Sequence, residues 1–340
     1  MENEYYKQKY LKYKLKYLNL LKGGNYIDDL ENNSIYTLDL SRGRLNNIDE
    51  LVEALKINSS LNELNLSGNN LNNDDIKKLA EALKINSSLT NLNLSLNDID
   101  NINDLAEALK INSSIIELNL SYNRINDIHN LAEALEISSS LTILNLYMND
   151  IDNIHDLAEA LKINSSLTEL DLSRNEIYNI DDFGEYLKYN SYLTDLNLDY
   201  NRISNIDNFS ECLKYNSSLT KLHLNLNNIN NINKLAEALK LNSSLSILSL
   251  GYNKINNIDE LAEALKINSS LTKLYLDVNK IDNIDNLYEA LKINSSLNVL
   301  NLQNNELKYK DKEKLISVLQ KSQKQQTQQP YNTALIQLEL

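Results

Sequence analysis

The sequence is poor in several residue types, because its 340 residues include one cysteine, one proline, six glycines and no tryptophan. The single Cys212 excludes an internal disulfide, and no Cys/His cluster has the spacing of a structural zinc site. The low glycine and proline content excludes collagen-like and Pro/Gly-rich disordered chains. No apolar run is long enough to cross a bilayer, and Lys interrupts the N-terminus where a signal peptide would be continuously apolar. We therefore expect an intracellular, cytoplasmic protein.

Basic residues are also scarce, with 33 Lys and Arg against 47 Asp and Glu, for a net charge of -14. The imbalance lies in the body of the chain, since residues 1–24 carry six Lys against two Glu. An acidic body repels a phosphate backbone, because nucleic-acid binders gain affinity from cations. We therefore expect no nucleic-acid partner.

The sequence is rich in one repeated pattern, a Leu-x-x-Leu-x-Leu segment that recurs at a period of 26 residues, with one interval of 28. The first apolar residues of these eleven segments are Ile35, Leu61, Leu89, Ile115, Leu141, Leu167, Leu193, Leu219, Leu245, Leu271 and Leu297. Repeats of this length indicate a solenoid of stacked units.

Each unit combines two periodicities. The first part alternates, so that Leu170 and Leu172 share one face of a short strand. The second part, as in residues 157–163, spaces large apolar residues by about one helical turn. We therefore predict an α/β, right-handed solenoid, a horseshoe with parallel strands on the concave face and helices on the convex face.

The ninth position of nearly every unit is Asn, and an inward amide there could bond backbone groups where the chain leaves the strand. These residues are Asn69, Asn97, Asn123, Asn149, Asn175, Asn201, Asn227, Asn253, Asn279 and Asn305. With this motif, residues 35–320 resemble leucine-rich repeat proteins, and the LAEALKINSSLT segments resemble the ribonuclease-inhibitor-like class. That class usually has 28 residues per unit, which only residues 61–88 keep, so we expect less room on the convex side of the other complete units.

Both ends differ from the repeats. Residues 1–34 include an expected helix at 5–21, which either caps the first unit or anchors the chain to an acidic surface or anionic membrane. The phrase KYLKYKLKYLNLLKGG also resembles N-terminal segments of Mimivirus-type giant-virus proteins, which implies a leader and a location in host cytoplasm or virion. Residues 321–340 comprise a Gln-rich stretch and then a Leu-x-x-Leu-x-Leu segment, residues 335–340, that could add a closing strand.

The repeats contain no pattern typical of a catalytic or metal-binding site. No nucleophile and base converge, and no phosphate-binding loop is present, so we expect no enzyme and no cofactor. His129 and His155 occupy equivalent positions near several Asp residues, but two imidazoles are few ligands, so we expect no metal site. Cys212 replaces a small packed Ala and is expected to be structural.

Aromatic replacements cluster in two consecutive units. Phe183 and Phe209 replace the Leu that opens the helical motif, and Tyr189 and Tyr215 replace an Ile just after it. We expect all four rings to pack in the core.

The outward strand positions should form columns on the concave wall. The first column changes from acidic to basic and apolar around Lys221, and the second is mostly Asn or Asp until His223, Ser249 and Tyr275. A ridge of aromatic, Met, Arg and aliphatic residues follows the strands; it forms an interface or packs against the turn of the next unit. The predicted partner-binding residues are Tyr147, Tyr200, Lys221, His223, Leu226, Tyr252, Lys273 and Tyr275.

We therefore predict a non-catalytic protein-binding scaffold, whose protein partner would be a host protein if the viral resemblance holds. One alternative is a GTPase-activating regulator resembling the Ran GTPase-activating protein, with Arg42 or Arg44 supplying the loop Arg. Another is a membrane-associated adaptor anchored by residues 5–21. The sequence does not indicate an oligomeric state.

Overall fold

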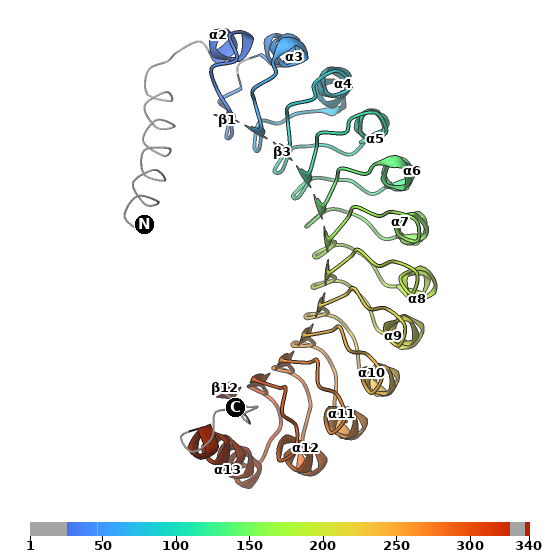
Figure 1. Cartoon of the computed structure of the whole chain (residues 1–340), viewed down its shortest axis with the longest axis vertical. Helices are drawn as coiled ribbons and strands as arrows, with labels where there is room; N and C mark the ends of the chain where they lie inside the picture. Colours follow the sequence, from blue (N-terminus) through green and yellow to red (C-terminus); the bar gives the residue numbers. More distant parts are fainter. Residues whose placement is uncertain (1–25, 46, 327–336) are drawn as a thin grey trace.

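The computed structural model describes residues 26–45, 47–326 and 337–340. They form one curved solenoid, with a sheet along the inner edge of the arc and a row of helices along the outer edge (Figure 1). The predicted helix at residues 5–21 lies outside the described residues, as does the end of the Gln-rich stretch after Gln326, whereas its first part belongs to the last helix. In the part that is described, no helix is long and apolar enough to span a membrane.

The strands form one parallel sheet in sequence order. They are β1 (Thr37–Asp39), β2 (Glu63–Asn65), β3 (Asn91–Asn93), β4 (Glu117–Asn119), β5 (Ile143–Asn145), β6 (Glu169–Asp171), β7 (Asp195–Asn197), β8 (Lys221–His223), β9 (Ile247–Ser249), β10 (Lys273–Tyr275), β11 (Val299–Asn301) and β12 (Gln337–Glu339). Equivalent residues of neighbouring units pair, as Leu196 does with Leu222. The predicted closing strand is confirmed, since β12 pairs with β11.

The helices lie on the convex side of every unit. They are α2 (Tyr26–Glu31), α3 (Ile48–Ile57), α4 (Asn73–Leu83), α5 (Asn103–Leu109), α6 (His129–Ile137), α7 (His155–Leu161), α8 (Asp181–Tyr186), α9 (Asp207–Leu213), α10 (Asn233–Leu239), α11 (Asp259–Leu265), α12 (Asp285–Leu291) and α13 (Tyr309–Gln326). The 28-residue unit has room for an 11-residue α4 with a capping box at Asn72, whereas α5 in the next unit has seven residues. Most helices of the 26-residue units are shorter than α4, but α3 and α6 have ten and nine residues, so unit length alone does not set helix length.

The core fills the space between sheet and helices with Leu, Ile and Ala. Phe183 and Phe209 are buried as predicted, and burial raises the pKa of the Cys212 thiol to about 12. A Cβ on Gly184 would lie 2.4 Å from the carbonyl oxygen of Asn208, so the glycine lets α8 approach α9.

The prediction for Tyr189 and Tyr215 is wrong, because their exposed fractions are 60% and 72%. Both residues follow the helix end, where the backbone turns away from the core. They therefore belong to the surface of the solenoid.

The inward orientation of the ninth-position asparagines is confirmed. The Asn175 amide donates to the carbonyls of Leu146 and Leu172, both at 3.0 Å, and its oxygen accepts the Ile151 N–H at 3.1 Å. These bonds link each turn to the unit before it. We call this series the turn asparagines.

A second series of buried asparagines follows the helices and was not predicted. Asn190 donates to the carbonyl of Leu161 at 2.7 Å, and its oxygen accepts the Leu193 N–H at 2.8 Å. We call this series the flank asparagines. One unit has Ser138 instead, and its buried hydroxyl has no hydrogen-bond partner.

Candidate binding surface

The second column of the concave face has a structural role in most units. In eight strands its Asn or Asp oxygen accepts the N–H of the residue two positions later, as Asn145 does from Tyr147 at 2.9 Å. This contact closes the turn that follows the strand. The near-uniform Asn and Asp of this column therefore follow from folding, without any requirement for a partner.

Three adjacent strands, β8 to β10, lack this contact because His223, Ser249 and Tyr275 occupy the position. In two of them the neighbouring unit replaces it: Asp199 accepts the Asn225 N–H at 2.6 Å, and Asn225 accepts the Gly251 N–H at 2.7 Å. Burial raises the pKa of the Asp199 carboxyl, although its bonds to Asn225 lower it. At β8 and β9 the side chain in the second column is therefore not needed to close the turn; we describe this column as released from turn closure there.

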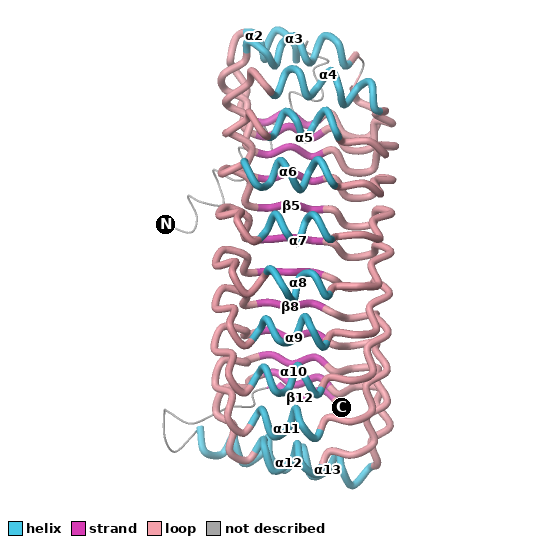
Figure 2. The backbone as a smooth tube through the Cα atoms, turned by 90° about the vertical axis from the view of Figure 1, so that its right-hand side faces the viewer, coloured by secondary structure: helices cyan, strands magenta, loops and turns pink. Residues whose placement is uncertain are grey.

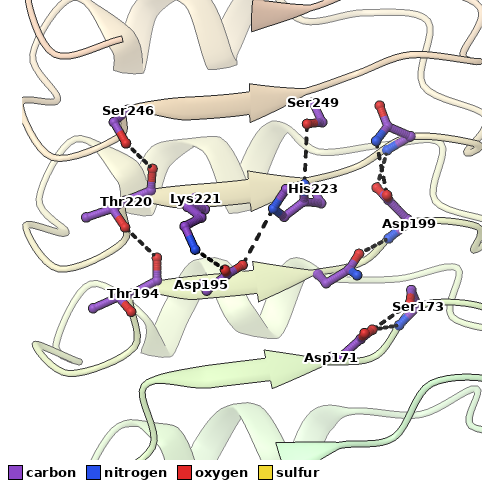
Figure 3. Close-up of polar contacts among 12 residues, drawn as sticks. Asp171, Ser173, Thr194, Asp195, Asp199, Thr220, Lys221, His223, Ser246 and Ser249 are labelled. Carbon is purple, nitrogen blue, oxygen red and sulfur yellow. Dashed lines mark hydrogen bonds and ion pairs between the residues drawn. The ribbon is translucent and has the colours of Figure 1, made fainter. Parts of the chain in front are cut away.

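The released His223 joins a polar cluster across β7, β8 and β9 (Figure 3). Asp195 lies 2.8 Å from the Lys221 ammonium and 3.6 Å from His223 Nε2, and Ser249 Oγ lies 3.3 Å from His223 Nδ1. The bond to Asp195 raises the pKa of Lys221. The cation and the imidazole are held in place, with Lys221 still partly exposed.

Lys273 and Tyr275 lie on β10, next to this cluster. The column-one neighbours of Lys273 are the aliphatic Ile247 and Val299. Within the described residues no ion pair includes Lys273, and its side chain is exposed. This strand therefore offers an unpaired cation beside apolar and aromatic groups.

The ridge beside the strands has an unusual backbone. Its residues, from Leu96 to Val278, all have φ between 50° and 58°, the left-handed region that non-glycine residues rarely adopt. Tyr200, Leu226 and Tyr252 are exposed there, as is most of the ridge. The turn geometry thus presents large side chains to solvent, which favours the interface alternative over packing against the next turn.

Tyr147 is separated from the other predicted residues. It lies just after β5, three strands from β8, and its ring packs edge-on against Tyr122 with centroids 5.0 Å apart. The Arg174 guanidinium lies 4.1 Å from the Tyr200 ring centre, between the two regions. The predicted residues therefore form two groups on one face.

Hollows on the concave face also extend beyond the predicted residues. One of about 350 Å³ lies over β1 to β5, and another of about 230 Å³ runs from Ile143 to His223. The short Asn and Asp side chains leave this space. No partner-binding residue was predicted from β1 to β4, because uniform Asn and Ser residues do not reveal how deep the surface is.

Comparison with known proteins agrees with this architecture. The sequence profile of the leucine-rich repeat family matches residues 58–80, 112–128, 164–179, 189–206 and 215–232. The chain has the fold of a leucine-rich repeat protein. No curated protein sequence matches it significantly.

Two solved structures share this leucine-rich repeat fold. An internalin from Listeria monocytogenes is 23% identical, with 86% of each chain covered and a TM-score of 0.51. TLR13, solved in complex with ssRNA13, is 22% identical over 81% of this chain and 41% of its own, with a TM-score of 0.58. At these identities the likeness concerns the fold alone.

The remaining candidates lie elsewhere on the leucine-rich repeat solenoid. His129 Nδ1 lies 2.8 Å from Asp156, and His155 Nδ1 lies 3.2 Å from Asp182, both across neighbouring units. Among the residues placed by the structure, no three potential metal ligands gather at one point. Arg42 lies exposed in the loop after β1.

Proposed function

We propose that the chain is a non-catalytic scaffold that binds a protein partner on its concave face. The β8–β10 surface, defined as Lys221, His223, Lys273 and Tyr275 with the ridge residues Tyr200, Leu226 and Tyr252, is the centre of the site. Tyr147 would extend it toward β5. The observation that carries the proposal is the release of the second column from turn closure at β8 and β9.

The chemistry of this surface favours a protein over a nucleic acid. Exposed Tyr, an unpaired Lys and aliphatic neighbours are the residue types that protein interface centres favour. Farther along the same wall, Glu63, Glu117 and Glu169 are exposed and would repel a phosphate backbone. The RNA in the TLR13 structure is a ligand of that protein, and the exposed Glu residues of this concave face do not favour RNA binding.

Three finer expectations belong to the same proposal. The helices of six to eleven residues from α3 to α12 on the convex side favour the ribonuclease-inhibitor-like class. The buried thiol of Cys212 is consistent with an intracellular location. The giant-virus relationship and a host partner remain predictions from the N-terminal sequence.

The test compares capture by matched bait proteins. Tyr252→Ala and Tyr275→Ala should each weaken binding of a captured partner by about 1–4 kcal/mol if they are central anchors. Ser67→Ala and Ser95→Ala change the N-terminal half of the same face and should be nearly neutral. Affinities would be measured by calorimetry with the purified partner.

The outcome distinguishes two faces of the molecule. A partner that binds both Tyr variants as tightly as the parent, and is lost when exposed residues of the convex helices are changed, would place the site on the other face. Equal loss in the Ser variants would move its centre to β2 and β3.

A further inference from the structure

One flank of the solenoid is uncharged. In each unit a six-residue segment leads from the helix to the next strand. It begins with an apolar residue and continues with uncharged residues. In ten consecutive units it contains no Asp, Glu, Lys or Arg. These segments are residues 57–62, 85–90, 111–116, 137–142, 163–168, 189–194, 215–220, 241–246, 267–272 and 293–298. We call this side the uncharged flank. Charged residues make up 24% of the chain, yet none occurs in these ten segments, which all lie on the same side of the solenoid.

The opposite flank, which leads from each strand to the next helix, is charged. Its segments carry residues of both signs, such as Asp98 and Asp100 in one unit and Arg124 in the next. The two sides of the solenoid therefore differ in electrostatic character. Figure 2 shows them as two nearly straight columns of loops on either side of the helices, so each flank is close to flat.

The uncharged flank also carries a ladder of exposed apolar side chains. The first residue of each segment is Ile, Leu or Tyr, with an exposed fraction between 60% and 72%. These rungs are Ile57, Ile85, Ile111, Ile137, Ile163, Tyr189, Tyr215, Leu241, Ile267 and Ile293. Scattered apolar residues are normal on a surface, whereas a regular ladder along one edge indicates an interaction site.

The backbone and the charges around the rungs are compatible with a contact that excludes water. The flank asparagines next to the rungs are buried and hydrogen-bonded, so the backbone that carries the ladder is held in place. Several of the Lys residues that precede the rungs are neutralised within their own helix, as Lys110 is by Glu107 at 2.6 Å and Lys214 by Glu211 at 2.6 Å. The exception is the central rung Tyr189, where the ammonium groups of Lys162 and Lys188 lie 5.6 and 4.9 Å from the ring centre and would stay over the ring on contact.

We propose that two copies of the chain associate through their uncharged flanks, stacked face to face with their units in opposite order. A two-fold axis in the plane of the arc brings the same flank of each copy together, and equal rung spacing lets the two ladders meet along their length. A second copy of the chain has rungs at the same spacing, so its ladder matches this one along the whole length.

Area and charge support this occupant. At their exposed fractions, ten residues of this size present roughly 1,000 Å² per chain, against the ~800 Å² that each partner buries in a standard interface. Two chains of net charge -14 repel, so the contact has to form where charge is absent. The opposite flanks carry charged residues of both signs and do not offer the same uncharged surface, so the stack would end at two copies and both concave faces would stay open.

The test measures the mass of the full chain in solution. Sedimentation velocity over a roughly hundredfold concentration range should show a reversible species of twice the 38.9 kDa chain mass. The double variant Ile163→Glu with Tyr189→Glu changes the two central rungs, so the two-fold axis would bring four carboxylates together. It should be monomeric throughout that range, with an unchanged far-UV spectrum because both residues are exposed.

A matched control uses the opposite, charged flank, where Tyr178 is exposed to a similar extent, 65%. Tyr178→Glu should dimerise like the parent. A monomeric parent, a dimer that survives the double variant, or loss of the dimer in Tyr178→Glu would each overturn the proposal. A monomeric parent that binds phosphatidylcholine vesicles through the same rungs would assign the ladder to a lipid surface instead.

Discussion

Two asparagines in nearly every unit bond backbone groups of the loops that connect the sheet and the helices. The turn asparagine bonds the loop after the strand, and the flank asparagine bonds the loop after the helix. The first was predictable, because an Asn that recurs at a strand end has an obvious backbone to bond. The second recurs just as regularly, but it lies among Ser residues in a segment that looks like an ordinary polar loop.

The turn asparagine predicts a loss of stability on truncation. Asn175→Ala should lower the free energy of unfolding by about 1–3 kcal/mol, because two carbonyls and one N–H lose a buried partner. Thermal and urea unfolding would measure the change. Asn230→Ala, at an exposed position, is the control and should leave the midpoint unchanged.

The flank series predicts a gain of stability where it is interrupted. In Ser138→Asn, the new amide would face the carbonyls of Leu109 and Asn112, by analogy with Asn164 and its partners Leu135 and Ser138. It would also remove an unbonded buried hydroxyl. We expect a gain of about 1 kcal/mol in urea unfolding. A lower urea midpoint would show that the loop at Ser138 has no room for the larger Asn side chain.

His129 and His155 predict a pH effect on stability. Hydrogen bonds to Asp156 and Asp182 raise the pKa of His129 and His155 above the ordinary value of 6.5. The folded state therefore holds these protons more tightly, so the stabilisation is complete below pH 6.5 and is lost as pH rises through the higher folded pKa. The double variant His129→Gln with His155→Gln should melt below the parent in acid and approach it in alkali. A gap that widens with pH would contradict this sign.

At the scale of elements, the α8–α9 pair shows how two units repack together. Two Phe rings enlarge the core while Gly184 lets the helices approach. The Leu-to-Phe replacement at the position that opens the helical motif correctly predicted burial for both rings. The same reasoning failed for Tyr189 and Tyr215, because α8 and α9 end before these residues and the helical period no longer applies.

The close approach predicts a strong effect of one methyl group. Gly184→Ala should destabilise by about 1–3 kcal/mol, because its Cβ would clash with the Asn208 backbone and force the helices apart. The reverse change in a unit that has Ala, Ala236→Gly, should cost only about 0.5–1 kcal/mol from helix propensity. Equal effects in urea unfolding would show that α8 moves freely.

At the scale of the whole molecule, the fold was predictable because eleven copies of one pattern leave few alternatives to stacking. The candidate site was predictable only in part. The column pattern identified His223 and Ser249 as exceptions to the Asn series, but it did not explain them. The explanation needs the register of β7, β8 and β9, which places the Asp199 carboxylate against the Asn225 N–H and Asn225 against Gly251.

The closing strand predicts a local effect of truncation. A chain that ends at residue 326 lacks β12, so the Asn298 carbonyl loses the Gln337 N–H and the Leu302 N–H loses the Glu339 carbonyl. Hydrogen exchange in the loop after β11 should become faster, while β5 and β6 keep their protection. Unchanged exchange at Leu302 would show that β12 contributes nothing to this end.

The strictly sequential strand order has a mechanical consequence. Each strand of the sheet pairs only with its predecessor and successor, so within the described part of the chain no strand pairing fastens the first unit to the last. A force applied at the two ends would meet the units one after another, each protected only by its own interfaces with its neighbours. Such a chain should extend under tension in a series of small steps of about one unit each, and recoil readily, because its contacts span short stretches of sequence.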